Sequence, residues 1–284
     1  MGVARKAKKA AKGIARQFAR KEAVTVPILE GSLLQDRRAI ITGGTSGIGR
    51  AIAEAFIRNG ANVVVCGRSS ERVTSTVEVL GEKAYGTTLD VRDPKSIAPA
   101  MEEACRLLGG EPDVLVNSAG VNGGGKFGAI EADAFDNVIE TNLKGTLLVS
   151  QEIARLMVRE GIEGNILNVS SSSALRPCNS PYTISKWGIC GLTLGMAKTL
   201  VPHGIVVNAV APGPTATPML NKDGDDITKP GSPIGRYAMP EEIANMAVVL
   251  VSALGRTIVG DTIYMTGGSG LITFDDIGGY DFEL

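Results

Sequence analysis

Short apolar runs alternate with amphipathic stretches along most of this chain. Apolar runs of strand length predict buried strands at 38–41, 63–66, 84–89, 114–116, 166–169, 205–210 and 262–265. Stretches with apolar residues at helical spacing predict helices at 51–59, 94–108, 135–156, 181–200 and 241–254. Strands that alternate with helices over this length favour a single α/β domain, a Rossmann-type doubly wound sheet of mostly parallel strands. Ligands of such a sheet bind beyond the carboxyl ends of its strands.

The composition fits one large domain with an extension at each end. The 284 residues carry a net charge of −1 and 44% hydrophobic residues. No apolar run reaches the roughly 18 residues that a membrane span needs. We predict a basic arm and linker at 1–36, a main domain at 37–270 and an acidic tail at 271–284.

Cysteine and histidine usage excludes several chemistries. The four cysteines are scattered without metal-ligand spacing, which predicts reduced thiols in a cytoplasmic protein. His203 is the only histidine and lies in a helix-ending Pro-His-Gly context. We therefore expect no metal and no Ser-His-Asp triad.

The first 21 residues hold eight Lys or Arg and no acid. Their apolar positions recur at helical spacing but are mostly alanine, which predicts a weakly amphipathic basic helix. Because alanine offers little apolar area, we favour a solvated or partner-docked arm. The alternative is weak contact with an anionic membrane surface, and we expect no nucleic-acid partner.

A glycine-rich turn follows the first predicted strand. It reads Thr42-Gly43-Gly44-Thr45-Ser46-Gly47-Ile48-Gly49 and is followed by a helix and a second strand, which completes a βαβ unit. The glycines let the backbone turn tightly and approach a pyrophosphate, whose charge lies against the helix N-terminus. In this context the spacing Gly-x-x-x-Gly-x-Gly predicts a dinucleotide site.

A second group of reactive residues begins where the strand at 166–169 ends. Four serines, Ser170 to Ser173, follow it, and Tyr182 and Lys186 lie four positions apart on the next helix. Residues at this spacing share a helix face, so the ammonium is expected to lower the tyrosine pKa from about 10 toward a value useful for acid–base chemistry. The alternative is an ordinary surface pair.

These motifs resemble, in content and order, the classical short-chain dehydrogenase/reductase family over about residues 37–270. The other matching positions are Asp90-Val91, Asn117-x-Ala119-Gly120, Asn142 and Pro212-Gly213. The resemblance implies an NAD(P)-dependent oxidoreductase that transfers hydride between nicotinamide and a ketone or secondary alcohol.

By this resemblance the catalytic residues are Ser171, Tyr182, Lys186 and Asn142. Tyr182 would be the general acid/base, and Lys186 would lower its pKa and bind the nicotinamide ribose. Ser171 would hold the substrate oxygen, and Asn142 would support a water-linked proton relay through Lys186. Ser170 and Ser172 are rivals of Ser171, because the loop to Tyr182 is shorter than the family commonly has.

The same resemblance implies a cofactor that runs along the carboxyl ends of the strands. The residues expected to bind it are Gly43, Thr45, Ser46, Gly47, Ile48, Gly49, Arg68, Asp90, Val91, Asn117, Ala119, Gly120, Tyr182, Lys186, Pro212, Gly213, Thr215 and Thr217. Ser118 stands where the family usually has a second asparagine. Thr217 resembles the threonine that meets the nicotinamide carboxamide, the alternative being a helix N-cap before Pro218.

The end of the second predicted strand bears on the choice of cofactor. An acid there would bond the ribose 2′-OH of NAD and repel a 2′-phosphate. The sequence Cys66-Gly67-Arg68-Ser69-Ser70 has no carboxylate and places an arginine to pair with phosphate. We predict NADP(H), with NAD(H) as the alternative if Arg68 only stacks on adenine.

Substrate and assembly follow from the resemblance alone. A 3-oxoacyl-carrier-protein reductase-like ketone reductase is the default, and a sugar or polyol dehydrogenase and a steroid dehydrogenase compete with it. The loops at 121–129 and 220–238 are where this family encodes specificity. A homotetramer or dimer is expected, with Trp187 and the acidic tail as candidate interface residues. A hypothesis of a different class is a cofactor-binding scaffold protein tethered by its basic arm.

Overall fold

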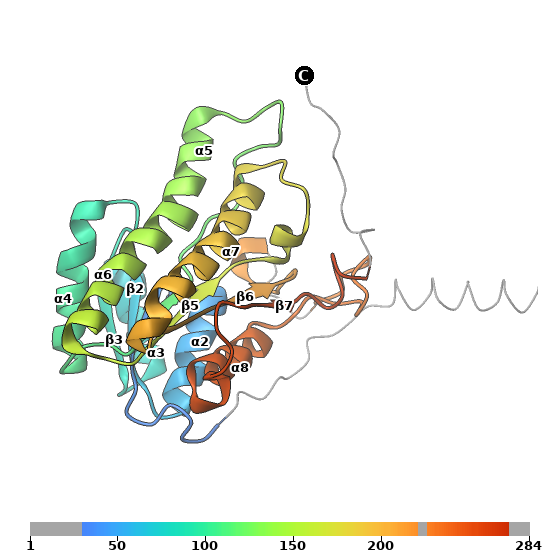
Figure 1. The fold of residues 1–284 in the computed structure, drawn as a ribbon. Coiled ribbons are helices and arrows are strands. Elements are labelled where there is room, and N and C mark those ends of the chain that lie inside the picture. Colours follow the sequence, from blue (N-terminus) through green and yellow to red (C-terminus); the bar gives the residue numbers. More distant parts are fainter. Residues whose placement is uncertain (1–29, 221–225, 273–284) are drawn as a thin grey trace, which may run out of the picture.

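A parallel sheet of seven strands forms the centre of the computed structural model, which describes residues 30–220 and 226–272 (Figure 1). Along the chain the strands are β1 (Arg38–Thr42), β2 (Asn62–Gly67), β3 (Ala84–Thr88), β4 (Val114–Asn117), β5 (Asn165–Val169), β6 (Val206–Pro212) and β7 (Thr262–Met265). Their order across the sheet is β3-β2-β1-β4-β5-β6-β7, and every neighbouring pair is parallel. The predicted doubly wound sheet is confirmed.

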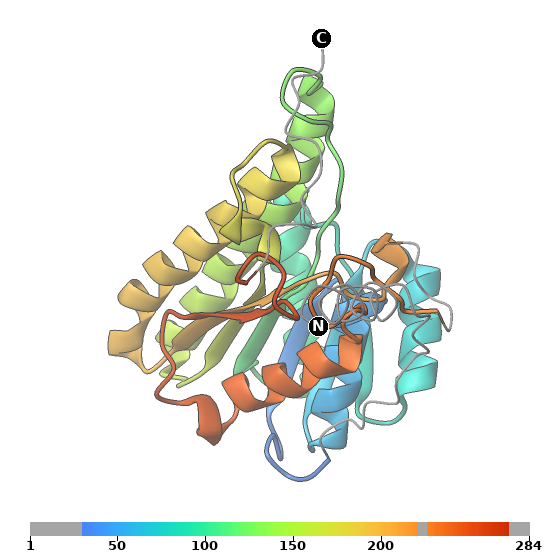
Figure 2. The same ribbon diagram turned by 90° about the vertical axis from the view of Figure 1, so that its right-hand side faces the viewer.

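Helices connect the strands and cover both faces of the sheet (Figures 1 and 2). They are α2 (Gly47–Arg58), α3 (Ser70–Leu80), α4 (Pro94–Leu108), α5 (Ala132–Ile139), α6 (Gly145–Glu160), α7 (Pro181–Leu200) and α8 (Pro240–Val251). Helices α4 and α7 begin and end at the predicted residues. The predicted helix at 51–59 begins four residues earlier, at Gly47, so the last glycines of the turn form its first turn.

The predicted helix at 135–156 is two α-helices joined by one π-helical turn, Glu140–Lys144. This turn is continuous with α5 and α6 and carries Asn142. Helix α3 was not predicted from the sequence. Its only buried residues are Val73 and Thr76, so it is a surface helix whose apolar pattern is weak. Ser69 marks its start, because the Ser69 side chain accepts a hydrogen bond from the backbone N–H of Arg72.

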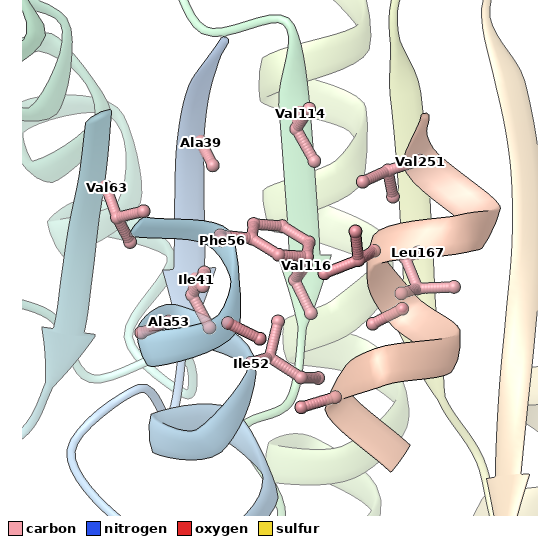
Figure 3. Close-up of a cluster of buried hydrophobic side chains, with 14 of the residues drawn as sticks. Ala39, Ile41, Ile52, Ala53, Phe56, Val63, Val114, Val116, Leu167 and Val251 are labelled. Atoms are coloured by element: carbon pink, nitrogen blue, oxygen red, sulfur yellow. The ribbon is translucent and has the colours of Figure 1, made fainter. Parts of the chain in front are cut away.

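Successive strand residues point to opposite faces of the sheet and build two hydrophobic cores. On one face Ile41, Val116 and Leu167 pack beneath Phe56 of α2 and Val251 of α8 (Figure 3). On the other face the neighbouring positions, which include Ile40, Leu115 and Ile166, pack against α4, α6 and α7. Burial on both faces explains why the strands read as continuous apolar runs.

The ends of the described chain bear on the predicted domain boundaries. Leu34, in the segment predicted as a linker, is fully buried in the core beneath α2. The predicted basic arm at 1–21 and residues 273–284 of the predicted acidic tail lie outside the described residues. Within residues 30–220 and 226–272, no helix is long and apolar enough to cross a membrane.

Candidate active site

The carboxyl ends of several strands open into one cavity of about 830 Å³. The cavity lies where the strand order reverses between β1 and β4, which is where doubly wound sheets bind ligands. Its volume is near the upper end of the range for small-molecule sites. The sheet topology therefore brings residues that are far apart in the sequence to one wall.

The cavity collects most of the residues predicted for the site. Its lining includes Gly43, Thr45, Ser46, Gly47, Ile48, Gly49, Arg68, Asp90, Val91, Ala119, Gly120, Ser171, Tyr182, Lys186, Pro212, Gly213, Thr215 and Thr217. The rival serines Ser170 and Ser172 also line it. Asn117 and Asn142 are not part of the lining and lie behind the wall.

The glycine turn forms one end of the cavity and directs the start of α2 into it. Gly43 and Gly47 have positive φ angles of 65° and 51°, which side chains disfavour. Helix α2 begins at Gly47, no side chain caps its N-terminus, and its first turn contains no acid. Its first N–H groups and its dipole thus suit an anion, as a dinucleotide pyrophosphate requires.

The end of the cavity beside β2 is rich in arginine. Arg68, Arg72 and Arg92 line it together with Asp90. The Arg92 guanidinium donates to Asp90 through Nη2 at 2.7 Å and through Nε at 3.1 Å, which holds the pKa of Asp90 below its ordinary value. With the one carboxylate paired, the charge that remains at this end is positive.

The four serines after β5 have different partners. Ser170 Oγ donates to the backbone oxygen of Lys186 at 3.0 Å, so it ties β5 to α7. Ser171 Oγ accepts the backbone N–H of Ser173 at 3.1 Å and donates to Ser173 Oγ at 3.2 Å. Ser171 thereby begins the short 3₁₀-helix Ser172–Leu175. Hydrogen bonding to Ser171 also acts on the pKa of Tyr182.

Helix α7 carries Tyr182 and Lys186 to the cavity, and its start is well defined. Ser180 caps it by accepting the N–H of Thr183, and Pro181 occupies its first position. Lys186 is buried, with 7% of its surface exposed, and its Nζ donates to the oxygen of Val169 at 2.8 Å. Burial lowers the pKa of Lys186 to about 8.

The expected effect of Lys186 on Tyr182 is not what the structure shows. Burial raises the pKa of Tyr182 above its ordinary value, and hydrogen bonding to Ser171 opposes the rise. Lys186 Nζ lies 5.6 Å from the ring centre and is bonded to Val169 instead. The prediction of a lowered tyrosine pKa is therefore wrong, because burial of the phenol outweighs its hydrogen bonding to Ser171.

Asn142 holds the chain that forms the cavity wall. Its Oδ1 accepts the N–H of Val121 at 2.8 Å, and its Nδ2 donates to the Val121 oxygen at 2.9 Å. Nδ2 also donates to Ser185 Oγ on α7 at 3.1 Å. A methyl group on Gly120 would lie 3.4 Å from Asn142 Oδ1 and 3.9 Å from Lys186 Nζ, so the amide and the ammonium flank the same glycine.

Asn117 lies deeper, at the end of β4. Its Nδ2 donates to Ser150 Oγ at 2.8 Å and to Asn168 Oδ1 at 2.9 Å, and Asn168 in turn donates to Thr193. These buried bonds link β4 and β5 to α6 and α7. In this structure Asn117 positions the strands that form the cavity.

Several residues of the cavity were missed in the sequence. They are Arg72, Leu89, Arg92, Thr141, Pro218 and Met219, among others. Arg72 carried a usable signal, because it lies four residues after Arg68, just beyond the cap that starts α3. The others lie one or two residues from a motif or on loops without a pattern.

Comparisons with known proteins agree with this geometry. A family model described as short chain dehydrogenase matches residues 37–228. A 3-oxoacyl-acyl-carrier-protein reductase of Aquifex aeolicus (strain VF5) is 37% identical over 246 residues, covering 83% of this chain and 98% of that protein. The crystal structure of an actinorhodin polyketide ketoreductase with NADPH has a TM-score of 0.76 at 33% identity, covering 83% of this chain and 98% of that one. A 3-ketoacyl-(acyl-carrier-protein) reductase of Brucella melitensis complexed with NADH has a TM-score of 0.76 at 28% identity, covering 84% and 100%.

Proposed function

Because the chain belongs to the short-chain dehydrogenase family, we propose that it is an NADP(H)-dependent ketone reductase, most like a 3-oxoacyl-thioester reductase. Membership makes it an NAD(P)-dependent oxidoreductase that acts on CH–OH groups. The observation that carries the proposal is the meeting of Ser171, Tyr182 and Lys186 on one wall of the cavity, beyond the glycine turn.

The bound nicotinamide supplies the hydride for reduction or accepts it for oxidation. In the proposed reduction, the Tyr182 hydroxyl gives its proton to the substrate oxygen, and Ser171 holds that oxygen with a hydrogen bond. Lys186 keeps its positive charge beside Tyr182 while the Tyr182 phenol loses its proton. Asn142 maintains the wall next to Lys186 through its bonds to Val121.

The protonation states of Tyr182 and Lys186 near pH 7 are compatible with the proposed reduction. The raised pKa of Tyr182 keeps the phenol protonated near pH 7, so the proton is available to give. Lys186, with its pKa at about 8, is mostly an ammonium at the same pH. This pKa fits the proposed role of the lysine as a cation beside the tyrosine at neutral pH.

We propose NADP(H) as the preferred cofactor because arginine dominates the end of the cavity beside β2. Arg68 and Arg72 line this end, β2 supplies no acid there, and Arg92 pairs with Asp90. Guanidinium groups suit a 2′-phosphate. Related structures hold NADPH in one case and NADH in another, so the choice rests on these arginines.

The substrate side of the cavity suits a substrate whose reacting group is uncharged. The charged residues of the lining are Arg68, Arg72, Asp90, Arg92 and Lys186, and only Lys186 is near the serines. Among the described residues of the lining, a substrate whose reacting end carries a carboxylate or phosphate would meet no cation besides Lys186. Met219 and Leu220 add apolar surface on the same lining, which suits an acyl chain. Sugar, polyol and steroid alcohols stay the competing substrate classes.

We also propose a homo-oligomer in a reducing compartment such as the cytoplasm. Trp187 and Leu194 of α7 leave 49% and 63% of their surfaces exposed, as a helix that packs against another copy would. All four cysteines are free thiols. The basic arm, and with it any membrane contact, stays a prediction.

The test is oxidation of NADPH and NADH in the presence of acyl thioesters, simple ketones, keto-sugars and steroids. Tyr182→Phe would be assayed beside the wild type, because it removes the transferable proton and keeps the ring. We expect NADPH-dependent turnover that is greatest with 3-oxoacyl thioesters and falls by roughly 10²–10⁴ in Tyr182→Phe. Cofactor binding without turnover of any substrate class would favour a scaffold or sensor.

A further inference from the structure

We infer that Ser173 is a second substrate-binding hydroxyl that selects ketones with another oxygen close to the reacting carbonyl. This inference rests on the proposed function and deepens it by naming the substrate feature that the site reads. The chemical class is a 1,2- or 1,3-dioxygenated ketone, of which a 3-oxoacyl thioester is an example.

The first observation is that Ser173 shares the cavity wall with Ser171. Both residues line the cavity, and their hydroxyl oxygens lie 3.2 Å apart. Ser173 is half-buried, whereas Ser170, Ser171 and Ser172 are buried. Of the four serines it is therefore the most open to a ligand.

The second observation is how the hydrogen-bonding capacity of Ser171 is used. A serine hydroxyl has one proton and two acceptor lone pairs. Ser171 Oγ accepts the N–H of Ser173, donates its proton to Ser173 Oγ and interacts with Tyr182. The single proton of Ser171 is therefore directed to Ser173. To bond a substrate oxygen, Ser171 must turn its proton away from Ser173.

The third observation is the proton of Ser173 itself. Among the described residues, Ser173 Oγ accepts a hydrogen bond from Ser171 and donates its own proton to no side chain or carbonyl. A ketone with a single oxygen replaces the Ser171–Ser173 bond with one bond from Ser171 and gains little. A ketone with a second nearby oxygen takes one proton from each hydroxyl, so one lost bond is replaced by two.

The backbone keeps the two hydroxyls together. Ser171 is the N-cap of the 3₁₀-helix that contains Ser173, and Ala174 closes this turn with a bond from its N–H to the oxygen of Ser171 at 3.0 Å. On the other side, Ser170 is held to α7 through the oxygen of Lys186. The spacing of the pair is therefore a property of the fold, as a preorganised recognition site needs.

The test compares two substrates in three proteins, all with NADPH. The substrates are the N-acetylcysteamine thioester of 3-oxobutanoate and its analogue with a methylene in place of the thioester carbonyl. The proteins are the wild type, Ser173→Ala and Ser173→Thr. For each substrate, the ratio of variant to wild-type kcat/KM cancels the intrinsic reactivity of the ketone.

We expect Ser173→Ala to lower kcat/KM for the 3-oxo thioester about 5- to 10-fold, which is the worth of one hydrogen bond, and to change that of the analogue less than about 2-fold. Ser173→Thr keeps a hydroxyl and should stay within about 3-fold of the wild type on the thioester. Equal losses on both substrates would overturn the inference and make Ser173 a positioning residue for Ser171. No loss on either substrate would overturn it as well.

Two control variants distinguish the effect of Ser173 from a general effect of substitution in this region and from a failure of the proposed function. Thr199→Ala removes an exposed hydroxyl near the end of α7, one that donates to the oxygen of Gly195, and should leave both activities unchanged. Tyr182→Phe should abolish both activities, which would uphold the proposed function whatever Ser173 does. A wild type that reduces neither substrate would remove the proposed function and this inference together.

Discussion

Lys186 Nζ lies 5.6 Å from the centre of the Tyr182 ring and donates a hydrogen bond to the backbone oxygen of Val169 at 2.8 Å. The ammonium is thus held beside the phenol by the end of β5. The lysine is also buried, which lowers its pKa to about 8. This arrangement has consequences for stability as well as for catalysis.

The stability of the protein should rise with pH above about 8 because of Lys186. In the folded chain the pKa of Lys186 is about 8, whereas an unfolded lysine titrates near 10.4. Between these values the unfolded state binds more protons, so the free energy of unfolding increases with pH. Below about pH 8 both states hold the lysine proton, and Lys186 no longer makes the free energy of unfolding depend on pH. Tyr182 has the opposite effect, but only above about pH 10, where the free phenol titrates.

Urea unfolding at pH 7.0 and 9.5 would measure this effect. We expect the wild type to gain on the order of 1–2 kcal/mol relative to Lys186→Met over this range. The methionine variant keeps most of the side-chain volume and has no proton to lose. The same pH dependence in both proteins would show that Lys186 is not the source.

Arg68→Ala should weaken NADPH selectively. Loss of one charge-assisted contact to the 2′-phosphate should raise KM for NADPH about 10-fold and leave KM for NADH within about 2-fold. Steady-state kinetics with both cofactors would check this. Arg106→Ala, on the exposed side of α4, is the matched control and should change neither value. Equal effects of Arg68→Ala on both cofactors would instead indicate stacking on adenine.

One glycine-to-alanine change should weaken cofactor binding, and another should stabilise the protein. A Cβ on Gly49 would collide with the backbone oxygen of Gly43, so Gly49→Ala should distort the turn and weaken NADPH binding by about 10-fold or more. A Cβ on Gly191, in the exposed part of α7, would meet nothing within 4 Å. Gly191→Ala should therefore raise the free energy of unfolding by about 0.5–1 kcal/mol. Cofactor titration and thermal unfolding of both variants test the pair.

Asn142→Ala should cost stability at the cavity wall. The change leaves the N–H and the carbonyl of Val121 without their side-chain partner, and each loss costs about 1–3 kcal/mol when the group is buried. Because Val121 is half-buried, we expect a loss of about 2–4 kcal/mol in urea unfolding, with reduced kcat. Asp136→Ala, on the exposed side of α5, should stay within about 0.5 kcal/mol. Equal stability of the two variants would contradict a bracing role for Asn142.

The fold could be predicted because its strands are buried on both faces. Runs such as Ile40-Ile41 and Val114-Leu115-Val116 carry apolar residues at every position, which only a doubly covered sheet needs. Helix α3 escaped prediction because its free energy depends on a cap at Ser69 and two buried side chains, and not on a strong apolar stripe.

The site could be predicted in part for a similar reason. Gly43, Arg68 and Ser171 each follow a recognisable strand, so topology brings them to one edge of the sheet. The pKa of Tyr182 could not be predicted from its spacing to Lys186, since it depends on burial and on the bond of Lys186 to Val169. Nor does the sequence distinguish the roles of four consecutive serines, because those depend on a 3₁₀ turn after β5.

The π-helical turn at Glu140–Lys144 determines in which direction around the helix axis the later side chains of the same helix point. A π turn holds about one residue more than an α turn, and one residue corresponds to about 100° of rotation around a helix axis. If the same residues were wound as a regular α-helix, α6 would rotate by about that angle, whereas deleting one residue together with the π turn would leave its orientation nearly unchanged. In the rotated helix, Val149, Ile153 and Met157 would turn away from the core that buries them. The extra residue therefore acts as a rotational spacer, which lets a single helix point Asn142 at the cavity wall and still present its apolar side to the sheet.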